Sequence, residues 1–157
     1  MTHRSHDTEV RQPVCAIYPG SFDPFTVGHM SVLRRALPLF DHIYIAVGIN
    51  DSKPSASLAD ERVRAIREAT AGIPGISVIT YTGLTVEKAR ELGATFMLRG
   101  VRSVTDFQYE QQLADINRNI SGIETVIIFT LPEHSFISSS MVRELDRHGH
   151  DISAYLP

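Results

Sequence analysis

The chain has 157 residues, about the length of one domain, and can bury a core without a disulfide or a metal ion. Hydrophobic residues make up 43% and charged residues 21%, which excludes the disordered, collagen-like and low-complexity classes. The net charge of −3 argues against a protein that coats nucleic acid or an anionic membrane, so a phosphate ligand would need a local cluster of positive groups.

The N-terminal residues 1–13 are polar and have no apolar core of the kind found in signal peptides. We expect them to form a flexible tail before a single domain at residues 14–157. No apolar run approaches the roughly 20 residues that cross a bilayer. Cys15 is the only cysteine, so no internal disulfide can form, and its apolar neighbours predict that it is buried. We expect a cytoplasmic protein.

Short β-branched runs alternate with segments of helical spacing along the whole chain. The expected strands are residues 14–18, 42–47, 76–81, 95–98 and 124–130. Between them, residues spaced by three or four predict helices: Met30, Leu33, Leu37 and Phe40; Ala59, Val63, Ile66 and Thr70; Tyr109, Leu113, Ile116 and Ile120. Several strands are apolar on both faces, as in sheets covered by helices on both sides. The pattern predicts an α/β fold, a single doubly wound Rossmann-like domain with a five-stranded parallel sheet.

Local signals mark the helix ends. Ser57-x-x-Asp60 and Ser103-x-x-Asp106 resemble capping boxes, with Asp in place of the usual Glu. Pro38 lacks the N–H that a helix interior needs, so the helix before it is expected to kink or to stop near Leu37.

Ligands of doubly wound folds bind beyond the carboxyl ends of the strands, where the strand order reverses. After the first expected strand, residues 18–25 form a turn rich in Pro and Gly that leads into Thr26-Val27-Gly28-His29 at a helix start. Free N–H groups and the helix dipole attract phosphate there. Gly28 allows close approach to the backbone, and His29 would point its imidazole at the same anion.

Positive groups follow two other expected strands. Lys53, one of only two lysines, follows the second strand and suits a mobile phosphate as a point charge. The other lysine, Lys88, fits a solvated helix surface. Arg99 and Arg102 flank Gly100 after the fourth strand, where they would present two guanidinium groups to one point.

Further candidates lie late in the chain. Ser138 to Ser140 enter a helix after the fifth strand and offer a second anion site, of which capping explains one serine. Glu110 could accept hydrogen bonds from a ribose or a base, whereas packing is the expected role of Tyr109. His148-Gly149-His150 fits a solvated helix end better than a metal site. The glycine-rich P-loop and dinucleotide-binding motifs are absent. The prediction of phosphate chemistry therefore rests on the candidate residues that follow four strands, whose carboxyl ends meet at one edge of the sheet.

Thr26-Val27-Gly28-His29 and Ile137-Ser138-Ser139-Ser140-x-x-Arg143 resemble the two signatures of nucleotidyltransferases that carry a T/H-x-G-H motif. Within that superfamily, residues 18–24, 99–102 and 106–110, with Asn117-Arg118, are similar to the bacterial phosphopantetheine adenylyltransferase family over residues 16–157. The resemblance implies transfer of the adenylyl group of ATP to 4′-phosphopantetheine with Mg²⁺, giving dephospho-coenzyme A and pyrophosphate, in a homohexamer. Many members have an aromatic residue where His134 stands.

The resemblance also implies roles for individual residues. The catalytic residues would be His29, Lys53 and Arg102. Phosphopantetheine would be held by Ser21, Lys53, Leu84, Thr85, Arg99, Leu113 and Asn117. ATP would be held by Ser21, Phe22, His29, Gly100, Val101, Arg102, Glu110, His134, Ser135, Phe136, Ile137, Ser138, Ser139 and Ser140. No residue is expected to bind a metal ion directly, and no nucleic acid or membrane partner is expected.

A phosphate monoester is already anionic at neutral pH, so such a reaction needs no general base, and repulsion between two anions is the barrier to lower. We therefore expect direct in-line attack on the α-phosphorus without a covalent enzyme intermediate. Two other functions stay open: a sister nucleotidyltransferase with another acceptor, such as nicotinamide mononucleotide or glycerol phosphate, and a non-catalytic nucleotide-binding regulator. Residues 99–102 and 106–110 argue against the first, and His29, Lys53 and Ser138 to Ser140 argue against the second.

Overall fold

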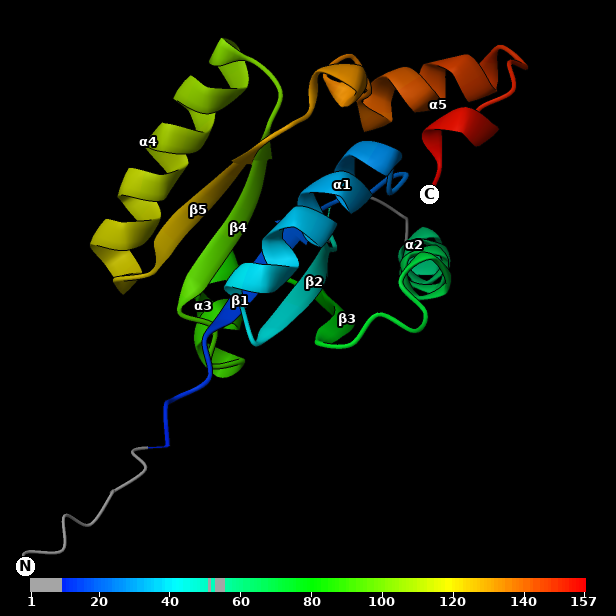
Figure 1. Ribbon diagram of the computed structural model, residues 1–157. Coiled ribbons are helices and arrows are strands. Elements are labelled where there is room, and N and C mark those ends of the chain that lie inside the picture. The colour runs from blue at the N-terminus through cyan, green and yellow to red at the C-terminus, as the bar shows by residue number, and fades with distance from the viewer. Residues whose placement is uncertain (1–9, 51, 53–55) are drawn as a thin grey trace, which may run out of the picture.

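The computed structural model describes residues 10–50, 52 and 56–157, and the side chains of all of these except 56 and 57. Five parallel strands form one sheet in the order β3-β2-β1-β4-β5 (Figure 1). The strands are β1 (Cys15–Gly20), β2 (His42–Gly48), β3 (Ile76–Tyr81), β4 (Phe96–Val101) and β5 (Glu124–Phe129). The expected α/β fold with a five-stranded parallel sheet is confirmed.

Helices cover both faces of the sheet. They are α1 (Val27–Ala36), α2 (Ala56–Ala69), α3 (Thr85–Glu91), α4 (Val104–Ser121) and α5 (Ser139–Arg147). One core cluster joins α1 and α2 to the sheet through buried residues such as Leu33, Ile66 and Ile45. The other lies on the opposite face and includes Val86 and Ala89 of α3. Helix α5 begins close to the turn before α1, because the hydroxyl of Ser139 donates a hydrogen bond to the carbonyl of Pro24 (Figure 1).

Two strands run further than the sequence predicted. β1 continues to Gly20 instead of ending at Tyr18, and β4 continues to Val101 instead of Leu98. Pairing with the outer neighbours explains both extensions, because β1 pairs with β2, and β4 with β5, along their whole lengths. Arg99 therefore lies inside a strand and not after it.

The two central strands separate at their carboxyl ends. β1 and β4 pair only at Ala16 and Ile17, and the strand order reverses between them. Pro19 lies in the open part of β1, where its missing N–H breaks no ladder. Its carbonyl oxygen instead accepts a hydrogen bond from Nη1 of Arg99 at 2.7 Å. A crevice thus opens at the point where doubly wound folds bind ligands.

The helix ends follow most of the sequence signals. α1 stops at Ala36, and the residues around Pro38 form a short 3₁₀ helix, Leu37–Leu39, as expected. Ser103 caps α4 by accepting a hydrogen bond from the N–H of Asp106. The Asp106 carboxylate accepts one from the N–H of Arg102 rather than from the cap residue. The expected cap at Ser57 falls outside the described side chains.

One helix exposes the face that the sequence predicted to be buried. Tyr109 is 60%, Ile116 58% and Ile120 51% exposed on α4. The spacing identified the helix correctly, but α4 turns Glu110 toward β4 instead. The prediction that Tyr109 packs inside the chain is therefore wrong.

Burial differs between β2 and β5, two of the strands that the sequence predicted to be covered on both faces. Ile43, Ile45 and Val47 of β2 are fully buried, as expected. β5 is an edge strand, and its last residue, Phe129, is 62% exposed. In the part of the chain that the structure describes, every helix is too short or too polar to cross a membrane.

Candidate active site

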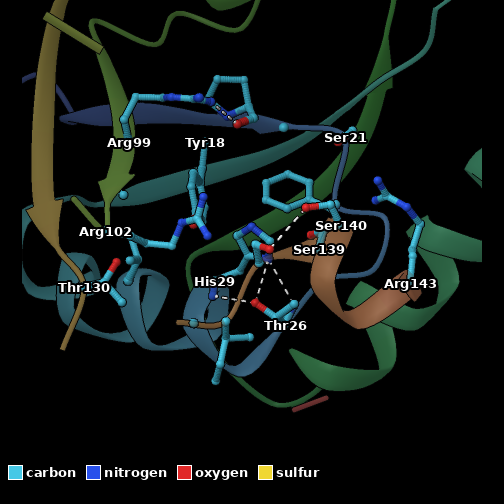
Figure 2. A pocket seen from close by; sticks show the side chains of 18 residues that line it. Tyr18, Ser21, Thr26, His29, Arg99, Arg102, Thr130, Ser139, Ser140 and Arg143 are labelled. Atoms are coloured by element: carbon cyan, nitrogen blue, oxygen red, sulfur yellow. Dashed lines mark hydrogen bonds between the residues drawn. The ribbon is translucent and has the colours of Figure 1, made fainter. Parts of the chain in front are cut away.

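A cavity of about 360 Å³ lies at the carboxyl ends of β1 and β4, between the starts of α1 and α5 (Figure 2). Ten residues to which the resemblance assigned a substrate line it: Ser21, Phe22, His29, Arg99, Gly100, Arg102, Ile137, Ser138, Ser139 and Ser140. They come from segments that are far apart in sequence. The expectation that separate strand ends meet at one crevice is confirmed.

His29 is held at the start of α1 by a reciprocal cap. Its Nδ1 accepts a hydrogen bond from the N–H of Thr26 at 3.0 Å, and the Thr26 hydroxyl accepts one from the N–H of His29. An Nδ1 that accepts a backbone N–H carries no proton, so the neutral ring has its proton on Nε2. His29 can therefore offer one N–H to a ligand in the cavity.

The surroundings of His29 keep it neutral. Burial, and then the positive charges of Arg102 and Arg99, lower the pKa of His29 from 6.5 to about 4. The imidazole is stacked on Phe25 and meets the ring of Phe22 edge-on. Burial among apolar rings and the charge of the nearby guanidinium groups both oppose protonation.

The three serines at the start of α5 have different roles. Ser138 caps the helix by accepting a hydrogen bond from the N–H of Met141, as expected for one of the three. The hydroxyl of Ser139 donates to the carbonyl of Pro24 and so ties α5 to the turn after β1. Two helix starts, those of α1 and α5, therefore border the same cavity and offer it their positive ends.

Phe22 contributes to the cavity mainly through its position in the turn. Its side chain is 3% exposed, and its backbone has a φ of 48°, a left-handed conformation that costs energy outside glycine. A side chain at Gly20 would lie 2.9 Å from the Phe22 ring, so glycine is needed there. The buried ring of Phe22 thus holds the turn against the core.

A second and larger cavity, of about 580 Å³, lies on the other face of the sheet, between α3 and α4. It contains six residues that the resemblance assigned to phosphopantetheine: Ser21, Leu84, Thr85, Arg99, Leu113 and Asn117. Its lining mixes apolar groups with hydroxyl and amide groups. Ser21 and Arg99 line both cavities, so the two spaces adjoin at these residues.

Arg99 is paired with Glu110 at the junction of the two cavities. Nε of Arg99 donates to Oε2 of Glu110 at 2.9 Å, and Nη2 donates to Oε1 at 2.6 Å. Burial alone would lower the pKa of Arg99, but the hydrogen bonds and charge of Glu110 raise it above its ordinary value. Arg99 therefore stays positively charged.

The remaining expected residues lie elsewhere. Val101 is buried in β4, and Glu110 lines the second cavity but not the first. His134, Ser135 and Phe136 precede α5 without lining either cavity, although a side chain at Gly28 would come within 3.9 Å of His134. Lys53 falls outside the described residues.

Arg143 belongs to the second sequence signature but was given no role of its own, and it lines the first cavity and donates to the carbonyl of Asp23. Its place four residues after Ser139 puts it on the same helix face. Sequence reasoning missed two residues of the second cavity. Tyr81 and Asn50 line the second cavity and follow the same strand-end rule as the residues that were found.

The first cavity is strongly positive. Arg99, Arg102 and Arg143 line it beside the two helix starts, and none of its described lining residues is an Asp or Glu. Arg102 is oriented by Asp106, whose Oδ2 lies 3.2 Å from Nε of the arginine. Such a site can stabilise several phosphate groups but offers no carboxylate to a metal ion.

Residues 17–145 match the model of the cytidylyltransferase-like family. The phosphopantetheine adenylyltransferase of Porphyromonas gingivalis is 50% identical over 142 residues, which cover 90% of this chain and 93% of that protein. The chain belongs to the phosphopantetheine adenylyltransferase family. Another member, from Flavobacterium psychrophilum, is 46% identical over 90% of this chain and 94% of its own length.

Solved structures support the fold of this phosphopantetheine adenylyltransferase family member. A nicotinic acid mononucleotide adenylyltransferase from Plasmodium falciparum has a TM-score of 0.64 at 19% identity, covering 92% of this chain and 90% of that chain. A protein from Vibrio parahaemolyticus has a TM-score of 0.65 at 23% identity, covering 92% and 94%. The family and the fold expected from the sequence are both confirmed.

Proposed function

We propose that this chain transfers the adenylyl group of ATP to 4′-phosphopantetheine, giving dephospho-coenzyme A and pyrophosphate in the synthesis of coenzyme A. Family membership supports the reaction. The observation that carries it in the molecule is the pair of adjoining cavities that share Ser21 and Arg99, one strongly positive and the other of mixed polarity. Each cavity suits one of the two substrates.

The first cavity is assigned to ATP. Its triphosphate would lie among His29, Arg102, Arg143 and the starts of α1 and α5, which together offset several negative charges. Ser21, Gly100 and Ile137 to Ser140 would contact the nucleotide as well. The resemblance also assigns Phe22, Val101, Glu110 and His134 to Phe136 to ATP, and we keep these as proposals.

The second cavity is assigned to phosphopantetheine. Leu84 and Leu113 offer apolar contacts, and Thr85 and Asn117 offer polar groups, to an arm that alternates methylene and amide groups. Arg99 would bind the phosphate at the end that adjoins ATP. Lys53 would bind the same phosphate, and its substitution by alanine is expected to weaken phosphopantetheine binding while ATP binding stays the same.

The reaction would proceed by direct attack. A phosphate oxygen of the acceptor forms a bond to the α-phosphorus of ATP while the bond to pyrophosphate breaks, and no enzyme group becomes covalently attached. The N–H of His29 and the charge of Arg102 would stabilise the negative charge that builds up on the transferred group. An α-phosphorothioate ATP of known chirality is expected to give inverted configuration, and retention would contradict direct attack.

We propose that Mg²⁺ enters bound to ATP, as part of the substrate. The donor set of the first cavity has arginines and hydroxyls but no carboxylate among its described residues. Mg²⁺ commonly keeps several waters and takes phosphate oxygens as ligands when it accompanies nucleotides. The residues of this cavity thus suit a nucleotide that brings its own metal ion.

The assembly and location are also proposals. Tyr109, Ile116 and Ile120 are each more than half exposed on α4. Ile116 and Ile120 also border the second cavity, and the apolar stripe that all three form favours association with further copies of the chain. We propose a homohexamer, which native mass spectrometry would detect as a particle of six chains. The cytoplasmic location stays a prediction to be checked by cell fractionation.

The test of the proposed function is pyrophosphate release from ATP by the purified protein with a panel of acceptors. We expect release with 4′-phosphopantetheine and none with nicotinamide mononucleotide, glycerol phosphate or buffer alone. Release with another acceptor would identify a sister nucleotidyltransferase. Binding of ATP without release under any condition would identify a nucleotide-binding regulator.

A further inference from the structure

Arg62 of α2 reaches across to the turn that follows β1. Its Nη1 donates a hydrogen bond to the backbone carbonyl of Ser21, which lies 41 residues earlier in the sequence. Its Nε donates to the carbonyl of Leu58, one turn earlier in the same helix, at 3.2 Å. The guanidinium group is thus anchored to its own helix and directed at Ser21. Because a charged donor makes a stronger hydrogen bond than a neutral one, this contact fixes the Ser21 carbonyl relative to α2.

Side chains of two helices hold the backbone of this turn. Besides the contact from α2, Arg143 of α5 donates to the carbonyl of Asp23. Ser139, also of α5, donates to the carbonyl of Pro24. Arg143 and Ser139 line the first cavity (Figure 2), whereas Arg62 lines neither cavity. Arg62 can therefore act on the site only through the backbone of the turn.

The bond from Arg62 acts on the peptide unit between Ser21 and Phe22. Phe22 has a φ of 48°, a strained conformation that persists only where neighbouring groups hold the backbone. The peptide bond is trans, so the C=O of Ser21 and the N–H of Phe22 point in opposite directions. By binding the C=O, Arg62 directs the N–H away from its own guanidinium group. No described residue accepts a hydrogen bond from this N–H, and Phe22 lines the first cavity.

We propose that Arg62 is a positioning residue for adenylyl transfer: it holds the peptide unit between Ser21 and Phe22 so that the N–H of Phe22 is offered to a phosphate group in the first cavity. Arg62 itself does not touch the substrates. Its positive charge also polarises the peptide unit, because linked hydrogen bonds strengthen one another, and this makes the N–H a better donor. The inference rests on the proposed function, which assigns the first cavity to ATP.

Steady-state kinetics and calorimetry of Arg62→Ala test the proposal against a matched control on the same helix. Arg67 also donates to a backbone carbonyl, that of Val78 in β3, at 3.1 Å, and it lines neither cavity. We expect Arg62→Ala to lower kcat by about 10- to 100-fold, since a misplacement of about 1 Å can cost roughly 10²-fold in rate. The Kd of ATP should rise by less than about fivefold, because Arg102, Arg143 and the two helix starts stay in place. Arg67→Ala should leave both values unchanged.

NMR of the Phe22 amide tests the orientation of the N–H itself, even if Arg62→Ala fails to fold. The chain has seven phenylalanines, so labelling them with nitrogen-15 gives a simple spectrum in which Phe22→Leu assigns the signal. We expect α,β-methylene ATP to shift this amide proton downfield in the wild type and in Arg67→Ala, and by less in Arg62→Ala.

Three results would overturn the inference while leaving the proposed function intact. They are an unchanged kcat in Arg62→Ala, equal losses of kcat in Arg62→Ala and Arg67→Ala, and a Phe22 amide that does not shift in the wild type. A wild-type protein that shows the shift but releases no pyrophosphate with 4′-phosphopantetheine would support the placement of the N–H and overturn the proposed function.

Discussion

The imidazole of His29 and the backbone N–H of Thr26 are joined by a hydrogen bond of 3.0 Å in which Nδ1 is the acceptor. This bond satisfies one of the free N–H groups at the start of α1 and at the same time fixes the tautomer of the ring. The histidine of the motif thus caps a helix and presents a neutral N–H donor to the cavity. Its protonation would break the cap.

The pKa of His29 is the first prediction. Because burial, Arg102 and Arg99 lower it to about 4, NMR titration of the free protein should detect neutral imidazole with Nε2 protonated throughout the range from pH 5 to pH 8. In His29→Gln the signal is absent, which assigns it. A titration midpoint near 6.5 would show that the ring is not desolvated as described.

The same shift predicts a pH dependence of the free energy of unfolding. The unfolded chain takes up a proton on His29 below pH 6.5, whereas the folded chain does so only near pH 4. Stability is therefore lost as the pH falls from about 6.5 toward 4, by about 3 kcal/mol at most. Urea unfolding of wild type and His29→Gln should show that the variant loses less stability over this range, and equal losses would contradict the prediction.

Removal of the imidazole should impair chemistry more than binding. We expect His29→Ala to lower kcat by roughly 10²- to 10³-fold, the usual cost of removing one preorganised donor to a transition state. ATP should still bind measurably, since Arg102, Arg143 and the start of α5 stay in place. Thermal unfolding controls for the lost helix cap. A variant with near-normal kcat would remove His29 from the mechanism.

Gly100 is predicted to be needed for packing beneath the site. A Cβ at this position would lie 3.0 Å from Cγ2 of Val32, which is 2% exposed. Gly100→Ala should therefore lower the free energy of unfolding by about 1–3 kcal/mol. Gly48→Ala is the matched control, because its added Cβ would lie 3.6 Å from the nearest atom.

The partner in this clash can be identified directly. In a Val32→Ala background, Gly100→Ala should cost less than in the wild type, because the methyl group that it meets is gone. Equal costs in the two backgrounds would mean that the strain arises elsewhere.

Thr125 offers a way to stabilise the protein. Its buried Oγ1 has no hydrogen-bond partner among the described residues. Thr125→Val replaces the hydroxyl by a methyl group of similar size and is expected to raise the free energy of unfolding by about 1 kcal/mol. Thr125→Ser keeps the hydroxyl and should bring no gain. A less stable valine variant would indicate that the hydroxyl has a partner.

The two helix starts that border the first cavity could be predicted because their signals are local. Thr26 to His29 and Ser138 to Ser140 each contain a cap residue and follow a strand, and the carboxyl ends of parallel strands share one edge of a sheet. Periodicity also identified α4. It could not tell which face of that helix is covered, because spacing reveals an apolar stripe but not what packs on it.

Contacts across the fold could not be predicted in this way. The sequence spacing of Arg99 and Glu110 does not predict their ion pair, since the pair depends on how closely α4 approaches β4. The division of the site into two cavities depends likewise on the separation of β1 from β4 after Ile17. Both features follow from tertiary packing rather than from sequence pattern.

The division of the crevice is tested most directly by a crystal structure of the protein with 4′-phosphopantetheine and α,β-methylene ATP, an analogue that cannot release pyrophosphate. We expect the triphosphate between His29 and Arg102, and the pantetheine arm between α3 and α4 with its phosphate on Arg99. Both ligands in the same cavity, or an acceptor phosphate away from Arg99, would contradict the account.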